Sequence, residues 1–102
     1  MFNSIPEILE DLKKGRMVIV VDDEDRENEG DLIMSASFAR GQDINFMAKY
    51  GRGLICVPME EARLQQLELE PMLKDKPHYG NKDPFSTAWM ISVDAAKGIT
   101  TG

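Results

Sequence analysis

Residues 17–34 have the sequence MVIVVDDEDRENEGDLIM, in which a dense acidic segment separates two apolar runs. The first run, residues 17–21, is a continuous series of mostly β-branched side chains, which is typical of a strand covered on both faces. The second run begins at Leu32 and resumes the apolar character, which predicts another strand. We therefore expect residues 17–21 to lie centrally in a sheet, with the acidic residues 22–31 between two strands.

The flanking sequence adds predicted helices and further apolar runs. Ser4 and Glu7 match a capping-box pattern at the start of an amphipathic segment, which predicts a helix over residues 5–14. Asp43 is expected to cap a second helix that ends before Gly51. The other expected elements are a buried strand at 53–57, a helix at 59–68, a surface loop at 72–86 and a strand at 87–93.

This succession of elements predicts the fold class. Helices that alternate with mostly buried strands are typical of an α/β (α+β) fold, in which helices cover a mixed sheet. A chain of 102 residues can form one modest core, so we expect a single domain over residues 1–102. Residues 98–102 follow a predicted strand without a closing element, so we expect the first part of a longer domain. The unpaired strand edge of such a part favours self-association.

Charge and composition exclude several classes of protein. The formal net charge of −6 argues against broad contact with nucleic acid, which requires clustered Lys and Arg. Cys56 and His78 are single examples of their types, so neither an internal disulfide nor a Cys/His zinc site can form within the chain. A basic and apolar leader is absent from the first residues, and no apolar run reaches membrane-spanning length. We expect a cytoplasmic protein without nucleic-acid or membrane partners.

The acidic segment 22–31 is the candidate site, with seven carboxylates in ten residues. An acidic run taken alone is more often a solvated turn. This run, however, follows the carboxyl end of a predicted buried strand, where open α/β sheets bind ligands. Acids at positions 25, 27, 29 and 31 can share a direction in an extended chain, and converging carboxylates suit Mg²⁺. Arg26 adds a planar cation for a phosphate or an enediolate.

Two rival ligand motifs fail on single positions. Asp25 would begin an EF-hand calcium loop, but position twelve of that loop is Ala36, where a bidentate Glu is needed. Gly51 and Gly53 would begin a dinucleotide fingerprint, but the third glycine is replaced by Cys56. Calcium and nucleotide binding are therefore disfavoured.

Several blocks in fixed order resemble the 3,4-dihydroxy-2-butanone 4-phosphate synthase family. The acidic decapeptide is the most specific of them, and the others support it by their spacing. The resemblance runs from about residue 5 to the last residue. The blocks are DDEDRENEGD at 22–31, GLICV at 53–57, TA at 87–88, SVDA at 92–95 and GITTG at 98–102.

The resemblance implies a lyase of riboflavin biosynthesis that converts D-ribulose 5-phosphate to 3,4-dihydroxy-2-butanone 4-phosphate and formate. The family uses Mg²⁺, or Mn²⁺ in its place, and works as a homodimer with sites near the subunit interface. By motif position, Arg26, Glu27 and Asp31 are implied substrate contacts. Glu27 and Asp31 are the implied catalytic residues, and Glu27 is also an implied metal ligand. Glu29 is a second-tier candidate for a site residue.

The chain departs from the family pattern in several places. It lacks the family's later Arg-Pro-Gly-His and Arg-x-Gly-His-Thr blocks and a catalytic glutamate, and the second of these blocks carries another metal ligand. Residues 74–83 differ from the expected Asn-rich stretch, so His78 is interpreted as an ordinary loop residue. Cys56 is interpreted as a small buried apolar residue, and Trp89 as a core residue. The roles of Thr100 and Thr101 stay open.

Two alternatives to a complete lyase remain. The chain could be a catalytically incomplete fragment that binds metal weakly, or an acidic domain whose residues 22–31 bind a basic partner. In the second case the number of charges matters more than their positions. Fusion to a GTP cyclohydrolase domain, as in some relatives, is also left open.

Overall fold

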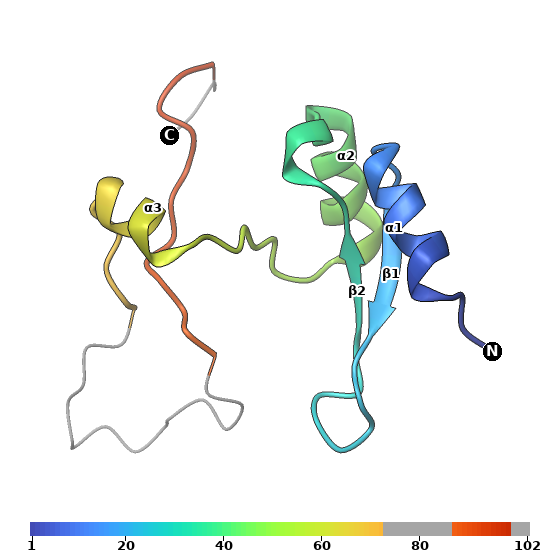
Figure 1. Cartoon of the computed structure of the whole chain (residues 1–102). Helices are drawn as coiled ribbons and strands as arrows, with labels where there is room; N and C mark the ends of the chain where they lie inside the picture. Colours follow the sequence, from blue (N-terminus) through green and yellow to red (C-terminus); the bar gives the residue numbers. More distant parts are fainter. Residues whose placement is uncertain (73–86, 99–102) are drawn as a thin grey trace. The chain divides into compact units, whose positions relative to one another are not determined.

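The computed structural model describes residues 1–72 and 87–98. Contacts between residues divide the chain into two compact units, Met1–Val57 and Pro58–Gly102. Figure 1 shows the helices and strands of both units. The expectation of a single domain over residues 1–102 stays a prediction.

The first unit begins with helix α1, Ile5–Lys13. The Glu7 carboxylate accepts hydrogen bonds from the backbone N–H and from the hydroxyl of Ser4, both at 2.8 Å. Gly15 follows the helix with φ of 73°, a left-handed conformation that glycine adopts without steric penalty. The predicted helix at 5–14 is thus confirmed, with an end one residue earlier.

Strands β1, Val18–Val21, and β2, Gly30–Ile33, form an antiparallel hairpin. Val18 is opposite Ile33, and Val20 is opposite Asp31. Helix α1 packs against β1. The prediction that the acidic segment 22–31 lies between two strands is confirmed, although its last two residues, Gly30 and Asp31, already belong to β2. In Figure 1 the connecting loop projects from the end of the hairpin, beyond α1 and α2.

The expected central position of β1 is wrong for the described residues. Their only sheet is two-stranded, and Val18 is the only residue among them that is buried, with 7% of its surface exposed. Ile19 on the same strand is 68% exposed. A run of β-branched residues shows that a strand is suited to burial on both faces, but the covering layers must come from other segments.

After β2 the chain forms a 3₁₀ turn η1, Ala36–Phe38, then α2, Gly41–Phe46, and a π-helical turn η2, Met47–Gly51. The predicted second helix is confirmed, but the expected role of Asp43 is wrong. Arg40 occupies the N-cap, and its N–H donates to Asp43 Oδ2 at 2.9 Å. The acid therefore caps from the third helical position, as in a capping box.

The expected buried strand at 53–57 is also wrong. These residues are exposed and belong to no strand, and Leu54 is 78% exposed. Cys56 is exposed as well, so its interpretation as a buried apolar residue is wrong. A strand requires a partner with matching backbone groups, and no described segment pairs with this one.

The second unit contains helix α3, Glu61–Gln66, which confirms a shorter form of the helix predicted at 59–68. The strand predicted at 87–93 is reduced to one antiparallel bridge between Pro71 and Met90. Trp89 is 39% exposed, so its assignment to a core is wrong. The predicted loop at 72–86 lies outside the described residues, apart from its first residue.

Together these elements confirm the α/β class, as helices combined with a small antiparallel sheet. None of the helices in the described parts of the chain is both long and apolar enough to span a membrane.

Candidate functional site

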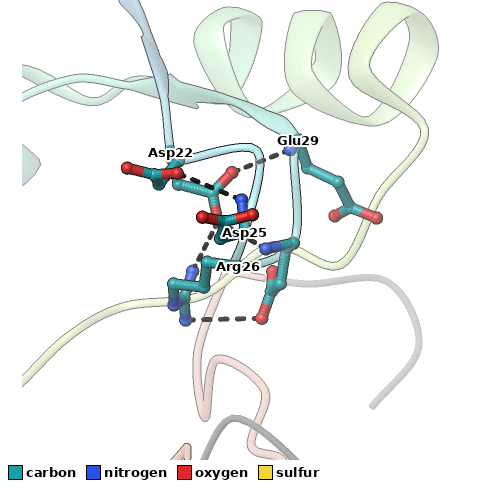
Figure 2. Close-up of polar contacts among 6 residues, drawn as sticks. Asp22, Asp25, Arg26 and Glu29 are labelled. Atoms are coloured by element: carbon teal, nitrogen blue, oxygen red, sulfur yellow. Dashed lines mark hydrogen bonds and ion pairs between the residues drawn. The ribbon is translucent and has the colours of Figure 1, made fainter.

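The loop between β1 and β2, residues 22–29, is organised around the carboxylate of Asp22 (Figure 2). Asp22 Oδ2 accepts hydrogen bonds from Arg26 Nη1 at 2.9 Å and from the Glu27 N–H at 3.0 Å. Asp22 Oδ1 accepts a hydrogen bond from the Glu29 N–H at 2.8 Å. One side chain at the end of β1 therefore holds three groups of the loop, and we call this arrangement the Asp22 clasp.

The backbone conformation of the loop makes the clasp possible. The Asp22 N–H donates to the Glu29 carbonyl at 3.2 Å, and the Arg26 N–H donates to the Asp23 carbonyl at 3.0 Å. Asn28 has φ of 52°, in the left-handed region that Asn tolerates better than most residues. The chain therefore turns between the two N–H groups that bind Asp22, and both can point inward.

The clasp places Arg26 and Glu27 in direct contact. Arg26 Nη2 lies 3.3 Å from Glu27 Oε1, while Nη1 of the same guanidinium binds Asp22. The side chains of Arg26 and Glu27 are 50% and 31% exposed. The half-exposed guanidinium has the planar donor geometry that suits an anion, and the partly exposed carboxylate beside it is a group that can accept a proton.

Asp31 lies on β2 rather than in the loop. It is exposed, and it lines a small cavity of about 100 Å³ together with Leu32, Met47 and Leu54. Its charge also contributes to the electrostatic environment of Arg26. The three predicted substrate contacts therefore belong to one hairpin, with Arg26 and Glu27 in contact and Asp31 acting on Arg26 through space.

Hydrogen bonds and nearby charges in the clasp favour the ionised forms of Asp22 and Arg26. The pKa of the Asp22 carboxyl is lowered chiefly by the hydrogen bond from the Glu29 N–H. Desolvation opposes this effect, and the hydrogen bonds from the Glu27 N–H and Arg26 lower the pKa further. The pKa of the Arg26 guanidinium is raised by its hydrogen bond to Asp22 and by the charge of Glu27. The only cation of the loop is thus fixed in its ionised form.

The expected convergence of alternating acids is wrong. The turn at residues 23–26 and the left-handed Asn28 interrupt the extended conformation on which that expectation depended. Figure 2 shows the side chain of Glu29 directed away from Arg26. Across residues 1–72 and 87–98, no three His, Cys, Asp or Glu side chains come together to hold a metal ion. The described residues therefore do not supply a complete set of ligands for Mg²⁺ or Mn²⁺ by themselves.

Sequence reasoning assigned no role to Asp22, whose carboxylate accepts hydrogen bonds from Arg26 and from the N–H groups of Glu27 and Glu29. A signal was available, because an Asp that directly follows a strand often accepts hydrogen bonds from N–H groups further along the chain. Of the other residues considered, Cys56 makes a local contact, its thiol donating to the Leu54 carbonyl at 3.8 Å. His78, Thr100 and Thr101 lie outside the described residues.

Comparison with known proteins agrees with the sequence blocks. A sequence model of the 3,4-dihydroxy-2-butanone 4-phosphate synthase family matches residues 6–102. The chain is 50% identical over 100 residues to the 3,4-dihydroxy-2-butanone 4-phosphate synthase of Pseudomonas aeruginosa, covering 98% of this chain and 26% of that protein. It is 52% identical over 103 residues to the riboflavin biosynthesis protein RibBA of Aquifex aeolicus, covering 99% of this chain and 24% of that protein.

A solved structure extends the similarity to the fold. The crystal structure of RibBX, a two-domain 3,4-dihydroxy-2-butanone 4-phosphate synthase from A. baumannii, matches with a TM-score of 0.69 and 43% identity. The match covers 78% of this chain and 23% of that one. The chain spans about a quarter of the length of the curated relatives that it matches. By its sequence and its fold, the chain belongs to the 3,4-dihydroxy-2-butanone 4-phosphate synthase family.

Proposed function

We propose that this chain forms part of a lyase of riboflavin biosynthesis that converts D-ribulose 5-phosphate to 3,4-dihydroxy-2-butanone 4-phosphate and formate. The observation that carries the proposal is the family match over residues 6–102, which includes the entire acidic loop. The contact between Arg26 and Glu27 in that loop supports it, because a sugar phosphate requires both a cation and an acid–base group.

Arg26 is the proposed anion-binding residue. A guanidinium offers planar N–H donors that suit the oxygens of a phosphate or an enediolate. The pKa of Arg26 is raised by Asp22 and Glu27, so its charge persists in their presence. Asp31 is the proposed partner of a substrate hydroxyl, where a carboxylate can orient the group or accept its proton.

Glu27 is the proposed contribution of the described residues to a Mg²⁺ or Mn²⁺ site. The remaining ligands are proposed to come from outside these residues, because the described residues gather no further set of ligating side chains. When bound, a divalent ion would stabilise the negative charge of an enediolate. We further propose that the whole protein is a cytoplasmic homodimer.

The decisive experiment joins residues 1–102 of this chain to the remainder of the Pseudomonas aeruginosa relative, in place of its matching segment. Formate release from D-ribulose 5-phosphate is measured with Mg²⁺, for the chimera and for its Glu27→Gln variant. We expect an active chimera and a loss of about 100-fold in the variant, the order of effect seen when one electrostatic partner of a transition state is removed. Glu24→Gln is the control, because it removes one charge from the same loop at a position outside the clasp.

Two results would contradict the proposal. An inactive but folded chimera would show that these residues cannot replace the matching segment of the relative. Equal activity of the chimera and its Glu27→Gln variant would remove Glu27 from the site. The 102-residue chain is assayed in parallel, since formate from it alone would mean that these residues build a working site without further ligands.

A further inference from the structure

We infer that Asp22 is a positioning residue, which sets the relative placement of the Arg26 guanidinium and Glu27 through hydrogen bonds to the guanidinium and to the loop backbone. The inference rests on the proposed function in one respect: Arg26 and Glu27, which Asp22 places, are the site residues of that function. It differs from the roles proposed for Arg26, Glu27 and Asp31, since Asp22 acts through these neighbours rather than on a substrate.

Both oxygens of Asp22 accept hydrogen bonds within the loop. Oδ2 binds the Arg26 guanidinium and the Glu27 N–H, at 2.9 and 3.0 Å, while Oδ1 binds the Glu29 N–H at 2.8 Å. The Asp22 side chain is 21% exposed, against 50% for that of Arg26. The carboxylate thus lies beneath the loop and supports it from inside, while Arg26 remains accessible.

The hydrogen bonds of Asp22 Oδ2 reach both members of the Arg26–Glu27 pair. The guanidinium is fixed through its Nη1 atom, and its Nη2 atom is then directed at Glu27 Oε1, 3.3 Å away. The backbone of Glu27 is fixed through its own N–H. Side chains in a functional site must be held close to their productive geometry by neighbours of this kind.

Asp22 differs from Asp23 and Glu24 in the groups that it contacts. Asp23 Oδ1 accepts the Asp25 N–H at 3.0 Å, a local contact that reaches neither Arg26 nor Glu27. The contacts of the clasp do not involve Glu24. Loss of charge at position 24 and loss of charge at position 22 are therefore expected to have different effects, although both lower the charge of the loop by one.

The test uses nuclear magnetic resonance of the 102-residue chain, comparing wild type, Asp22→Asn, Asp22→Ala and the charge-matched control Glu24→Gln. The readouts are the hydrogen-exchange rates of the Glu27 and Glu29 amides and the rotation of the Arg26 guanidinium. In Asp22→Ala we expect both amides to exchange about tenfold faster, which is the usual scale for loss of a hydrogen bond to a charged group. We also expect the Arg26 guanidinium to rotate more freely.

Asp22→Asn separates positioning from a general effect on folding. The Asn side chain keeps one acceptor oxygen and replaces the other with an NH₂ group. It can therefore accept a hydrogen bond from the N–H of Glu27 or of Glu29, but the second acceptor is lost. We expect it to preserve the signals of the hairpin, at Val18 and Ile33, while it frees the guanidinium. Glu24→Gln is expected to change none of these readouts.

Two outcomes would overturn the inference. Unchanged amide exchange and guanidinium rotation in Asp22→Ala would show that the clasp does not hold these groups. Loss of the hairpin signals in Asp22→Asn would show that Asp22 supports the strands instead of placing side chains. Neither readout depends on catalysis, so an inactive chimera would contradict the proposed function and leave this test unaffected.

Discussion

The carboxylate of Asp22 lies 2.9 Å from the guanidinium of Arg26, across a turn that begins where β1 ends. The pKa of the Asp22 carboxyl is lowered chiefly by the hydrogen bond from the Glu29 N–H, and the contact with Arg26 lowers it further. The same contact raises the pKa of the Arg26 guanidinium. In a segment whose acids repel one another, it gives the single cation a fixed place. The loop is thereby more ordered than its composition alone implies.

Helix α1 is expected to become less stable in acid because of Glu7. Hydrogen bonds from the N–H and then from the hydroxyl of Ser4 lower the pKa of Glu7 from its ordinary value. A carboxyl with a lowered pKa stabilises the folded state fully above its unfolded value, and this contribution is lost as pH falls through the lower folded value. The pH dependence of the α1 amide signals measures the effect, and Glu7→Gln is expected to flatten it. An unaltered profile in the variant would exclude Glu7 as the cause.

Gly15→Ala is expected to destabilise the first unit. The residue has φ of 73°, and a methyl group there would lie 2.9 Å from Phe38 Cγ. The left-handed conformation alone costs about 1–2 kcal/mol for a residue with a Cβ, and the close contact adds to it. Gly41→Ala is the matched control, because nothing lies within 4 Å of the added methyl group. Urea unfolding compares the two variants, and equal midpoints would contradict this account.

Substitutions at Asn28 are expected to follow backbone conformation rather than charge. With φ of 52°, the position accepts glycine, so Asn28→Gly leaves the Glu27 and Glu29 amides protected. Asn28→Ala adds about 1 kcal/mol or more of strain, and faster exchange of these two amides is expected. If glycine and alanine have the same effect on hydrogen exchange, the turn does not depend on the left-handed residue.

The 102-residue chain is expected to self-associate as its concentration rises. Ile19 is 68% exposed on a two-stranded sheet, and strands with exposed apolar side chains and free edges promote pairing between chains. Ile19→Lys is expected to shift sedimentation velocity toward the monomer. Ile5→Lys is the control, since Ile5 is 71% exposed but lies on α1. A similar shift in both variants would mean that the hairpin is not the contact surface.

The elements that could be predicted are those with local signals. Ser4 and Glu7 mark the start of α1, and the two apolar runs around the acidic segment mark the hairpin. Local signals could not decide whether strands form at 53–57 and 87–93, since a strand exists only where another segment pairs with it. The exposure of Trp89 and Cys56 has the same origin, because burial depends on residues distant in the sequence.

Part of the candidate site was also predictable. The proximity of Arg26 and Glu27 follows from their adjacency in the chain, whereas their contact depends on the turn that the loop makes. That turn requires Asn28 in the left-handed conformation, and it requires that Asp22 accept hydrogen bonds from two backbone N–H groups. An acidic composition does not reveal either feature, and the alternating pattern of acids pointed instead to an extended chain.

Every hydrogen bond of the Asp22 clasp joins residues that lie within positions 22–29. Little chain entropy is lost when so short a segment closes, and contacts of low sequence separation form rapidly. The hydrogen bonds that place Arg26 and Glu27 therefore require no segment outside the hairpin and its loop. Groups supplied by distant segments would then meet a partner whose geometry already exists.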